Sequence, residues 1–247
     1  DATAARGRPQ LAVGHGAATR AGLPPSALAA LAGNESFLVR SLPTKPGAQL
    51  PTVVMSGGPA ATRGTYYATT RLLEELGMVF LATDETVIPP CPHAGWSAGL
   101  NVSISPLFEF RDCDASPNLN LSFNLRQHYN GESALGFLPR NDTQHGGYVQ
   151  YAGGMVHTSY SILGGAPHAP GGNGPPLDLF HSNNEWFWPH DDPLAYGQLC
   201  WSNTSLIDFV TERVKVTLRA APTATIVSVS QNGERNAARR LSPRPTG

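Results

Sequence analysis

The first ninety residues follow a pattern in which apolar runs alternate with stretches of helical period. Short alternating or continuous apolar stretches predict strands, whereas apolar residues three or four positions apart predict helices. Strands are therefore predicted at Ser36–Pro43, Pro51–Gly58 and Met78–Thr83, and helices at Pro24–Gly33 and Arg63–Gly77, with Ser26 as N-cap of the first helix. Strands that alternate with helices favour an α/β layer from Leu11 to about Pro90.

The helix predicted at Arg63–Gly77 follows a glycine turn, as the helix of a phosphate-binding loop does. Such a loop needs backbone N–H groups at the helix N-terminus and usually a lysine. The stretch SGGPAATRG contains neither GK[ST] nor GxGxxG, and Pro59 has no N–H to offer. The helix carries instead an apolar stripe of Tyr66, Thr69, Leu72, Leu73 and Leu76, so the sequence predicts a scaffold helix that packs on a sheet and ends at Gly77.

The proline-rich stretch Val87–Gly95 separates this layer from a part of the chain with longer loops. Beyond it, strands are predicted at Leu107–Asp112, Met155–Leu163 and Thr223–Gly233, and an amphipathic helix at Ser202–Ala220 with Ser202 or Asn203 as its cap. The last segment, Glu234–Gly247, is basic and has no hydrophobic period. It is predicted to be disordered, with a truncation scar or a reading-frame artefact as alternatives.

The composition of the chain argues against several classes of binding partner. The net charge is −1 and charged residues make up only 14%, so no basic excess points to nucleic acid. No apolar run is long enough to span a membrane, and the histidines lack metal-ligand spacing, so no membrane span, metal or cofactor is expected. Five Asn-x-Ser/Thr triplets favour a glycoprotein that is secreted or made in another oxidising compartment. The pairing of Cys91, Cys113 and Cys200 and the oligomeric state stay open.

Two groups of motifs resemble known families. The stretch PTVVMSGGPAATRGTYYATTRLLEELGMVFLATDETVIP is similar to the small α/β domain that precedes the barrel of alpha-glucuronidases and beta-hexosaminidases. The downstream pieces FEFRD, VHTSYSIL, NNEWFW, GQLCWSN and ATIVSVSQN resemble a family catalogued as a domain of unknown function, in which such a domain joins a glycosidase-type barrel. The resemblance covers about Leu11–Asn232.

The resemblance implies an α/β fold in two parts: a small mixed α/β domain at residues 1–90, and a partial (β/α)8, TIM-type barrel at residues 91–233, before the tail at 234–247. It makes FEFRD, HTSYSIL and TIVSVSQN the first three barrel strands, after which we expect the chain to be truncated. Related glycosidases take their catalytic acid and its partner from later strands, so the catalytic residues of this chain are unknown and we expect it to lack that pair.

Polar residues at the ends of the predicted strands are candidates for sugar binding, because barrel active sites lie at the carboxyl ends of strands. These candidates are Arg111, Asp112, His157, Gln231 and Asn232, together with Arg126 in the stretch NLRQHYNGE. The resemblance implies that they hydrogen-bond sugar hydroxyl or carboxylate groups. The structural alternatives are a local Arg111–Asp112 ion pair that shapes a loop and a purely structural role for His157.

The aromatic stretch EWFW adds Trp186 and Trp188, whose flat faces suit stacking on sugar rings or burial in a core. The resemblance as a whole implies a carbohydrate-active hydrolase of O-glycosidic bonds, with an oligo- or polysaccharide as its partner. A carbohydrate-binding protein without catalysis and a degenerate fragment remain as alternatives.

Overall fold

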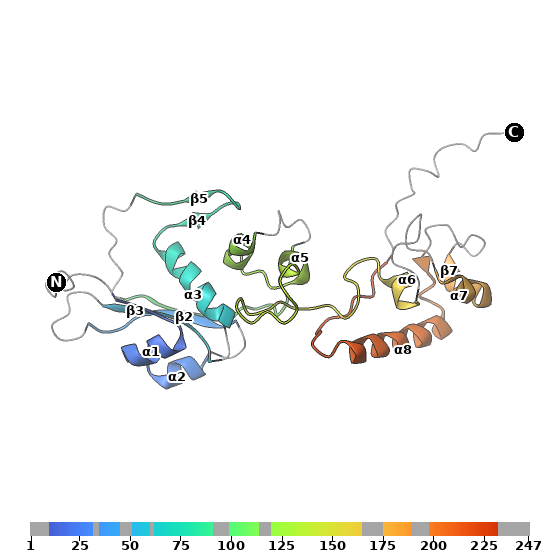
Figure 1. Cartoon of the computed structure of the whole chain (residues 1–247), viewed down its shortest axis with the longest axis horizontal. Helices are drawn as coiled ribbons and strands as arrows, with labels where there is room; N and C mark the ends of the chain where they lie inside the picture. Colours follow the sequence, from blue (N-terminus) through green and yellow to red (C-terminus); the bar gives the residue numbers. More distant parts are fainter. Residues whose placement is uncertain are drawn as a thin grey trace. The chain divides into compact units, whose positions relative to one another are not determined.

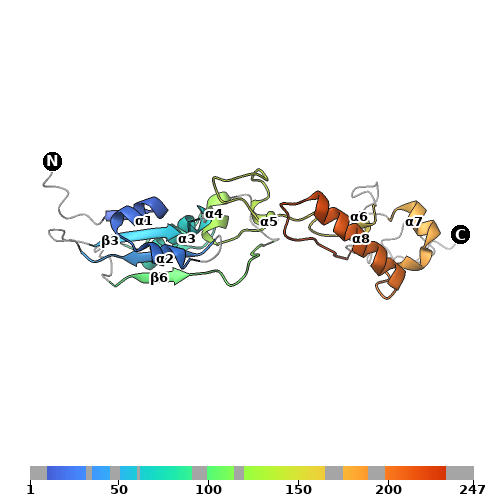
Figure 2. The same cartoon turned by 90° about the horizontal axis from the view of Figure 1, so that it is seen from below.

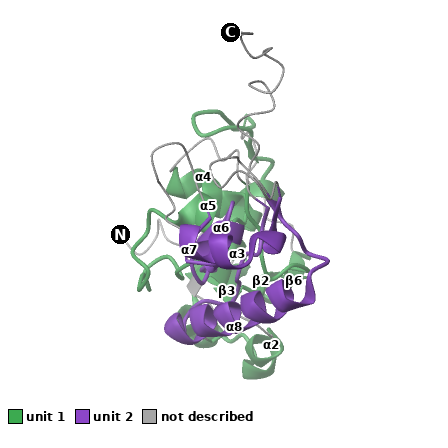
Figure 3. Cartoon of the chain, turned by 90° about the vertical axis from the view of Figure 1, so that its right-hand side faces the viewer, with its two compact units in different colours: residues 1–148 green, residues 149–247 purple. Residues whose placement is uncertain are grey.

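The computed structural model describes residues 10–31, 35–44, 51–59, 62–90, 99–113, 120–164, 175–188 and 198–231. The chain divides into two compact units, Asp1–Tyr148 and Val149–Gly247 (Figure 3). The first unit therefore continues well past the proline-rich stretch at Val87–Gly95, where composition alone had placed the end of the first domain.

The first unit is built around a mixed four-stranded sheet in the order β1-β3-β2-β6 (Figure 2). The strands are β1 (Gln10–Val13), β2 (Phe37–Ser41), β3 (Thr52–Gly57) and β6 (Asn101–Ile104). β1 runs parallel to β3, whereas β2 is antiparallel to both β3 and β6. The mixed α/β class is thereby confirmed, as are the two strands predicted at Ser36–Pro43 and Pro51–Gly58.

Helices cover both faces of this sheet (Figure 1). α1 (His15–Ala21) and α2 (Pro25–Ala29) pack with Leu38 and Val54, while α3 (Thr62–Glu75) packs on the opposite face with Val39 and Val53. Because neighbouring side chains of a strand point to opposite faces, the apolar runs of β2 and β3 supply both cores at once.

Three details of the predicted N-terminal layer are wrong. The second helix begins at Pro25 after Pro24, so Ser26 lies inside the helix and is not its N-cap. α3 buries Tyr67, Ala68 and Leu72, whereas Tyr66 is 38% exposed, because the face toward the sheet is turned by one residue from the predicted stripe. The strand after α3 is short, since β4 (Val79–Phe80) pairs only with β5 (Thr86–Val87). The helix does end before Gly77, which has the positive φ of 88° that favours glycine.

The rest of the first unit consists of α4 (Leu121–Arg126) and α5 (Glu132–Leu135), which share a small core that includes Leu125 and Leu138. The strand predicted at Leu107–Asp112 is wrong. In the described range 99–113 only β6 is a strand, and Leu107 and Phe108 are 94% and 71% exposed. Apolar alternation makes a strand only when a neighbouring strand pairs with it, and none does here.

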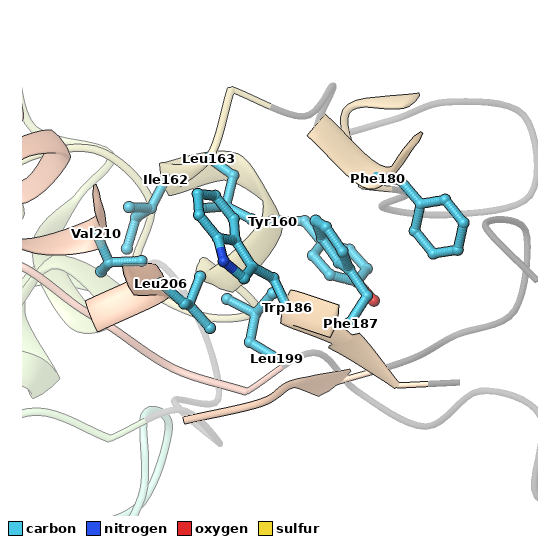
Figure 4. Close-up of a cluster of buried hydrophobic side chains, with 9 residues drawn as sticks. All are labelled: Tyr160, Ile162, Leu163, Phe180, Trp186, Phe187, Leu199, Leu206 and Val210. Atoms are coloured by element: carbon cyan, nitrogen blue, oxygen red, sulfur yellow. The ribbon is translucent and has the colours of Figure 1, made fainter. Parts of the chain in front are cut away.

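The second unit contains α6 (Ser159–Ile162), α7 (Leu177–Ser182), the 3-10 turn η2 (Asn184–Trp186), β7 (Phe187–Trp188), β8 (Gln198–Leu199) and α8 (Thr204–Ala220). Their side chains meet in one core, shown in Figure 4, which consists of Tyr160, Ile162, Leu163, Phe180, Trp186, Phe187, Leu199, Leu206 and Val210. The long helix is confirmed together with its cap, because the Asn203 side chain accepts hydrogen bonds from the N–H groups of Ser205 and Leu206.

The other two predicted strands of this unit differ from what is observed. Met155–Leu163 contains the helix α6 and no strand. Thr223–Gly233 contains no strand in its described part, which ends at Gln231, but Ile226 makes an isolated parallel bridge with Tyr151. The tail at 234–247 lies outside the described residues.

Candidate functional site

A largely buried carboxylate, Glu35, is the centre of a polar network in the first unit. Its Oε1 accepts a hydrogen bond from Arg63 Nη1 at 2.6 Å, and its Oε2 accepts from Asn130 Nδ2 at 3.1 Å and from Arg111 Nη2. The hydroxyl of Tyr67 lies 3.4 Å from Oε1. Two guanidinium groups and one amide therefore hold both oxygens of this carboxylate.

The guanidinium group of Arg111, a candidate for sugar binding, is hydrogen-bonded within this network. Besides Glu35, it donates from Nε to the His128 carbonyl at 2.7 Å and from Nη1 to the Phe108 carbonyl at 2.5 Å. Burial acts to lower the pKa of Arg111, but the hydrogen bond and the charge of Glu35 outweigh it and raise that pKa. The ion pair that Arg111 makes is thus with Glu35, 76 residues earlier in the sequence, and not with its neighbour Asp112.

The ring of His128 packs against this network without a hydrogen bond to its Nε2. It stacks on Tyr67 with ring centroids 4.1 Å apart and meets the edge of Phe37 at 5.9 Å. Burial and the nearby Arg111 lower the pKa of His128 to about 4, and burial raises the pKa of Tyr67 to about 12. His128 also has a positive φ of 61°, which is uncommon for a residue other than glycine.

Asp112 caps the start of α5. Its carboxylate accepts hydrogen bonds from the N–H groups of Ser133 at 2.8 Å and Ala134 at 2.9 Å, and from that of Cys113 at 3.0 Å. A Cβ on Gly131 would lie 2.2 Å from Asp112 Cγ, so glycine is required where the carboxylate approaches the backbone. Arg126, a further candidate, lies elsewhere in the unit with its guanidinium carbon 4.7 Å from the centroid of the Phe80 ring.

In the second unit, hydroxyl groups join two segments that lie far apart in the sequence. Thr158 Oγ1 donates to the Ser228 carbonyl at 2.7 Å and accepts from the Ser230 N–H at 3.0 Å, while the Ser159 N–H donates to the Ser230 carbonyl at 3.0 Å. His157 Nδ1 lies 3.2 Å from the Gln231 carbonyl oxygen. The structure therefore brings His157 and Gln231 together, two candidates that are 74 positions apart.

This centre is more open to solvent than the Glu35 network. The side chains of His157 and Gln231 are exposed, although Thr158 and Ser159 beside them are buried. His157 has a φ of 55°, and it shares with His128 the only positive φ values of non-glycine residues in the described part of the chain. Backbone strain of this kind is concentrated at functional sites in proteins, which makes His157 a candidate of its own.

The two tryptophan candidates have opposite environments. Trp186 is 6% exposed and donates from its indole N–H to Ser205 Oγ at 2.8 Å, as a core residue does. Trp188 is 62% exposed on β7, where it is paired with Gln198 of β8. Of the two stacking surfaces predicted from the sequence, only the Trp188 ring faces solvent.

Sequence reasoning missed the centre of the first network. Glu35 is inside one of the Asn-x-Ser triplets, while Tyr67 and Asn130 lie in the stretches RGTYYATTRLLEELG and NLRQHYNGE, which did not predict their contacts with Glu35. No local signal identifies them, because the contacts join residues about 30 to 95 positions apart. Asn232 lies outside the described residues, so its place in the site is not defined.

The described residues include no group of three or more potential metal-ligating side chains. Among them, His145 is paired with Asp142 at 3.0 Å. Cys113 and Cys200 are both free thiols in the structure. Within the same described ranges, no helix combines the length and the apolar character needed to cross a membrane.

Comparison with known proteins adds one finding. A family model described as Domain of unknown function (DUF4838) matches residues 80–239, which is more than half of the chain. The matched range includes Arg111, His157, Trp188 and Gln231, and it confirms the expected kinship with a domain-of-unknown-function family. No curated protein and no solved structure matches the chain.

Proposed function

We propose, from the premise that the chain belongs to the DUF4838 family, that it is a carbohydrate-active protein related to hydrolases of O-glycosidic bonds. The proposal extends the resemblance of its motifs to glycosidase-type proteins. It takes an oligo- or polysaccharide as the ligand and the open centre of the second unit as the binding site. A secreted protein that carries sequons would meet such ligands outside the cell.

One observation carries this proposal. Tyr151 pairs in parallel with Ile226, and the helix α8 lies between them in the sequence. A strand, a helix and a parallel strand form the unit that (β/α)8 barrels repeat, and barrel active sites lie just beyond the carboxyl ends of the strands. His157 follows the first of these segments and Gln231 follows Ile226 in the second, so in such a barrel both would lie on the side where the substrate binds.

The groups at this centre are suited to sugar recognition. The His157 ring and the Gln231 amide can exchange hydrogen bonds with hydroxyl groups, and the exposed face of Trp188 can stack on a pyranose ring. His157 and Trp188 flank in sequence the contact between Tyr160 and Phe187, whose ring centroids lie 6.1 Å apart. Both residues of the proposed site are therefore neighbours in sequence of residues in the core of the second unit.

A second candidate function, carbohydrate binding without catalysis, is favoured by the state of the carboxylates. Glycoside hydrolysis uses two carboxyl groups roughly 5 to 9.5 Å apart, on either side of the bond that is cleaved. Glu35 is held by Arg63 and Arg111, and Asp112 is held by three backbone N–H groups. Neither carboxylate is therefore placed to exchange protons with a sugar.

Glycan-array binding of the purified protein tests the proposal, with Trp188→Ala as the informative variant. We expect wild-type protein to bind a defined class of glycan and Trp188→Ala to weaken that binding about fivefold or more, since a lost stacking contact is worth about 1 kcal/mol or more. Leu177→Ala is the matched control, because Leu177 is a 53% exposed apolar residue of the same unit. An array without any binding would overturn both candidate functions.

Hydrolysis of a panel of nitrophenyl glycosides then separates the two functions. Binding together with turnover supports a hydrolase, whereas binding without turnover supports the non-catalytic protein. Gln231→Ala should weaken binding and leave the unfolding midpoint unchanged, because Gln231 contacts His157 through its backbone carbonyl. Equal binding by wild type and Gln231→Ala would exclude this residue from the site.

A further inference from the structure

A turn on the surface of the first unit carries one of the five Asn-x-Ser/Thr triplets, which consists of Asn141, Asp142 and Thr143. The Asp142 N–H donates to the Pro139 carbonyl at 2.9 Å, which closes the turn with Asn141 as its third residue. Asn141 and Thr143 are exposed, whereas the Asp142 side chain between them is only 8% exposed. The triplet therefore turns its middle residue inward and offers its two outer residues to solvent.

The carboxylate of Asp142 holds this loop in place. It accepts hydrogen bonds from the N–H groups of His145 at 3.0 Å and Gly147 at 3.1 Å, and its Oδ1 lies 3.0 Å from His145 Nδ1. In the described part of the chain, the side chains of Asn141 and Thr143 take part in no hydrogen bond. A group attached to the Asn141 amide would therefore break no contact that holds the turn.

The other triplets hold their asparagines differently. Asn120 and Asn203 are partly exposed and cap α4 and α8 through their side-chain oxygens. Asn101 is exposed on β6, but its Oδ1 accepts from Arg40 Nε of the paired strand at 2.8 Å. Asn34 lies outside the described residues. Among the triplets whose asparagine is described, only the one at residues 141–143 combines an exposed asparagine with a side chain free of hydrogen bonds.

We propose that Asn141 is a site of N-linked glycosylation. Asn-x-Ser/Thr with a middle residue other than proline is the acceptor of this modification, and a bulky glycan is accommodated on surface loops. In the transfer, Nδ2 of Asn141 bonds to the anomeric carbon of an oligosaccharide, and the bond from that carbon to the diphosphate of a lipid-linked donor breaks. The diphosphate leaves with the electron pair of the broken bond, and the amide releases one proton.

This site is independent of the proposed carbohydrate-binding centre, because that centre lies in the second unit. It requires only that the chain enters a secretory compartment, which the five triplets favour. An empty glycan array would leave the glycosylation site intact, and an unmodified Asn141 would leave the proposed function intact.

Peptide mass spectrometry tests the site on the full chain, secreted with an added leader from a eukaryotic cell that attaches N-glycans. N-glycosidase turns each glycan-bearing asparagine into aspartate, which marks the position of the glycan. We expect Asn141 to have the highest occupancy of the asparagines in the described triplets. An unmodified Asn141, or one occupied less often than the helix caps Asn120 and Asn203, would overturn the proposal.

Two substitutions at Thr143 test the dependence of the glycan on the triplet. Thr143→Ala removes the required hydroxyl and should abolish the glycan at Asn141, which appears as a gel shift of one glycan. Thr143→Ser keeps a hydroxyl and is the matched control, expected to migrate with the wild type. Neither change should disturb the fold, because the Thr143 side chain is exposed. Equal mobility of the wild type and Thr143→Ala would contradict the site.

Release of the glycan under native conditions tests its structural setting. Because Asn141 lies in an exposed turn, N-glycosidase should remove this glycan from the folded protein as completely as from the denatured protein. Release only after denaturation would contradict the proposal, since it would mean that the modified asparagine is not at the surface.

Discussion

The Glu35 network of the first unit and the His157–Gln231 centre of the second unit differ in the partners of their polar groups. In the first unit, charged side chains lie in the interior, with Glu35 13% and Arg63 5% exposed, and each finds a partner of opposite charge. In the second unit, hydroxyl groups and backbone carbonyls make the contacts, and the side chains of His157 and Gln231 stay at the surface.

Polar residues near predicted strand ends can therefore have very different surroundings in the fold. Arg111 and His157 look equivalent in the sequence, since each adjoins a predicted strand. Arg111 has its guanidinium engaged by Glu35 and by two carbonyls, whereas the exposed ring of His157 faces solvent. The first arrangement holds the fold together, and the second leaves the ring at the surface, where we propose that a ligand binds.

The largest effect is expected when the charged centre loses its carboxylate. Glu35→Ala leaves the Arg63 and Arg111 guanidinium groups buried without their counter-charge, which should lower the free energy of unfolding by about 3–5 kcal/mol in urea titrations. The control is Glu212→Ala in the second unit, which removes an exposed ion pair with Lys215 and should change stability little. Similar losses in both variants would refute the contrast between the units.

Acid should weaken the first unit through His128. Its pKa is lowered to about 4 in the folded state against about 6.5 when unfolded, so the unfolded chain takes up the proton first. Stability is then full above about pH 6.5 and is lost as the pH falls to about 4, by at most about 3 kcal/mol, since solvent screens a ring that is only partly buried.

His128→Asn is the variant that isolates this effect, because asparagine tolerates the positive φ and does not titrate in this range. We expect thermal unfolding of the variant to depend less on pH between 6.5 and 4 than that of the wild type. Identical pH profiles would show that the acid response arises from other groups.

A smaller loss is expected at Asp112. Removal of its carboxylate by Asp112→Ala leaves the N–H groups of Cys113, Ser133 and Ala134 without their acceptor, which should cost about 2 kcal/mol in chemical unfolding. If Asp112 instead serves the sugar site, the substitution should reduce glycan binding while the unfolding midpoint stays constant.

The smallest effect is expected at the N-cap of α8 in the second unit. Asn203→Ala removes the acceptor for the N–H groups of Ser205 and Leu206 and should cost about 1 kcal/mol. Asn141→Ala is a suitable control, because Asn141 is exposed in a loop and caps no helix. A loss as large as that of Glu35→Ala would mean that the second unit also depends on one polar contact.

Elements that are stabilised by residues close in the sequence could be predicted from local patterns. The helix α8, its Asn203 cap, the helix α3 and the strands β2 and β3 follow from period, capping and apolar runs. The segments at Leu107–Asp112 and Met155–Leu163 were assigned wrongly, because a strand needs a partner and the alternation within one segment does not supply it.

The α/β class, the kinship of the chain and the set of candidate residues follow from local patterns in the sequence. The long-range contacts of the fold give each of those residues its surroundings. It placed Arg111 against Glu35, Trp186 in a core and His157 beside Gln231. The physical reason is that hydrogen bonding and burial are satisfied across long sequence separations, so the role of a polar side chain depends on which distant group folding brings to it.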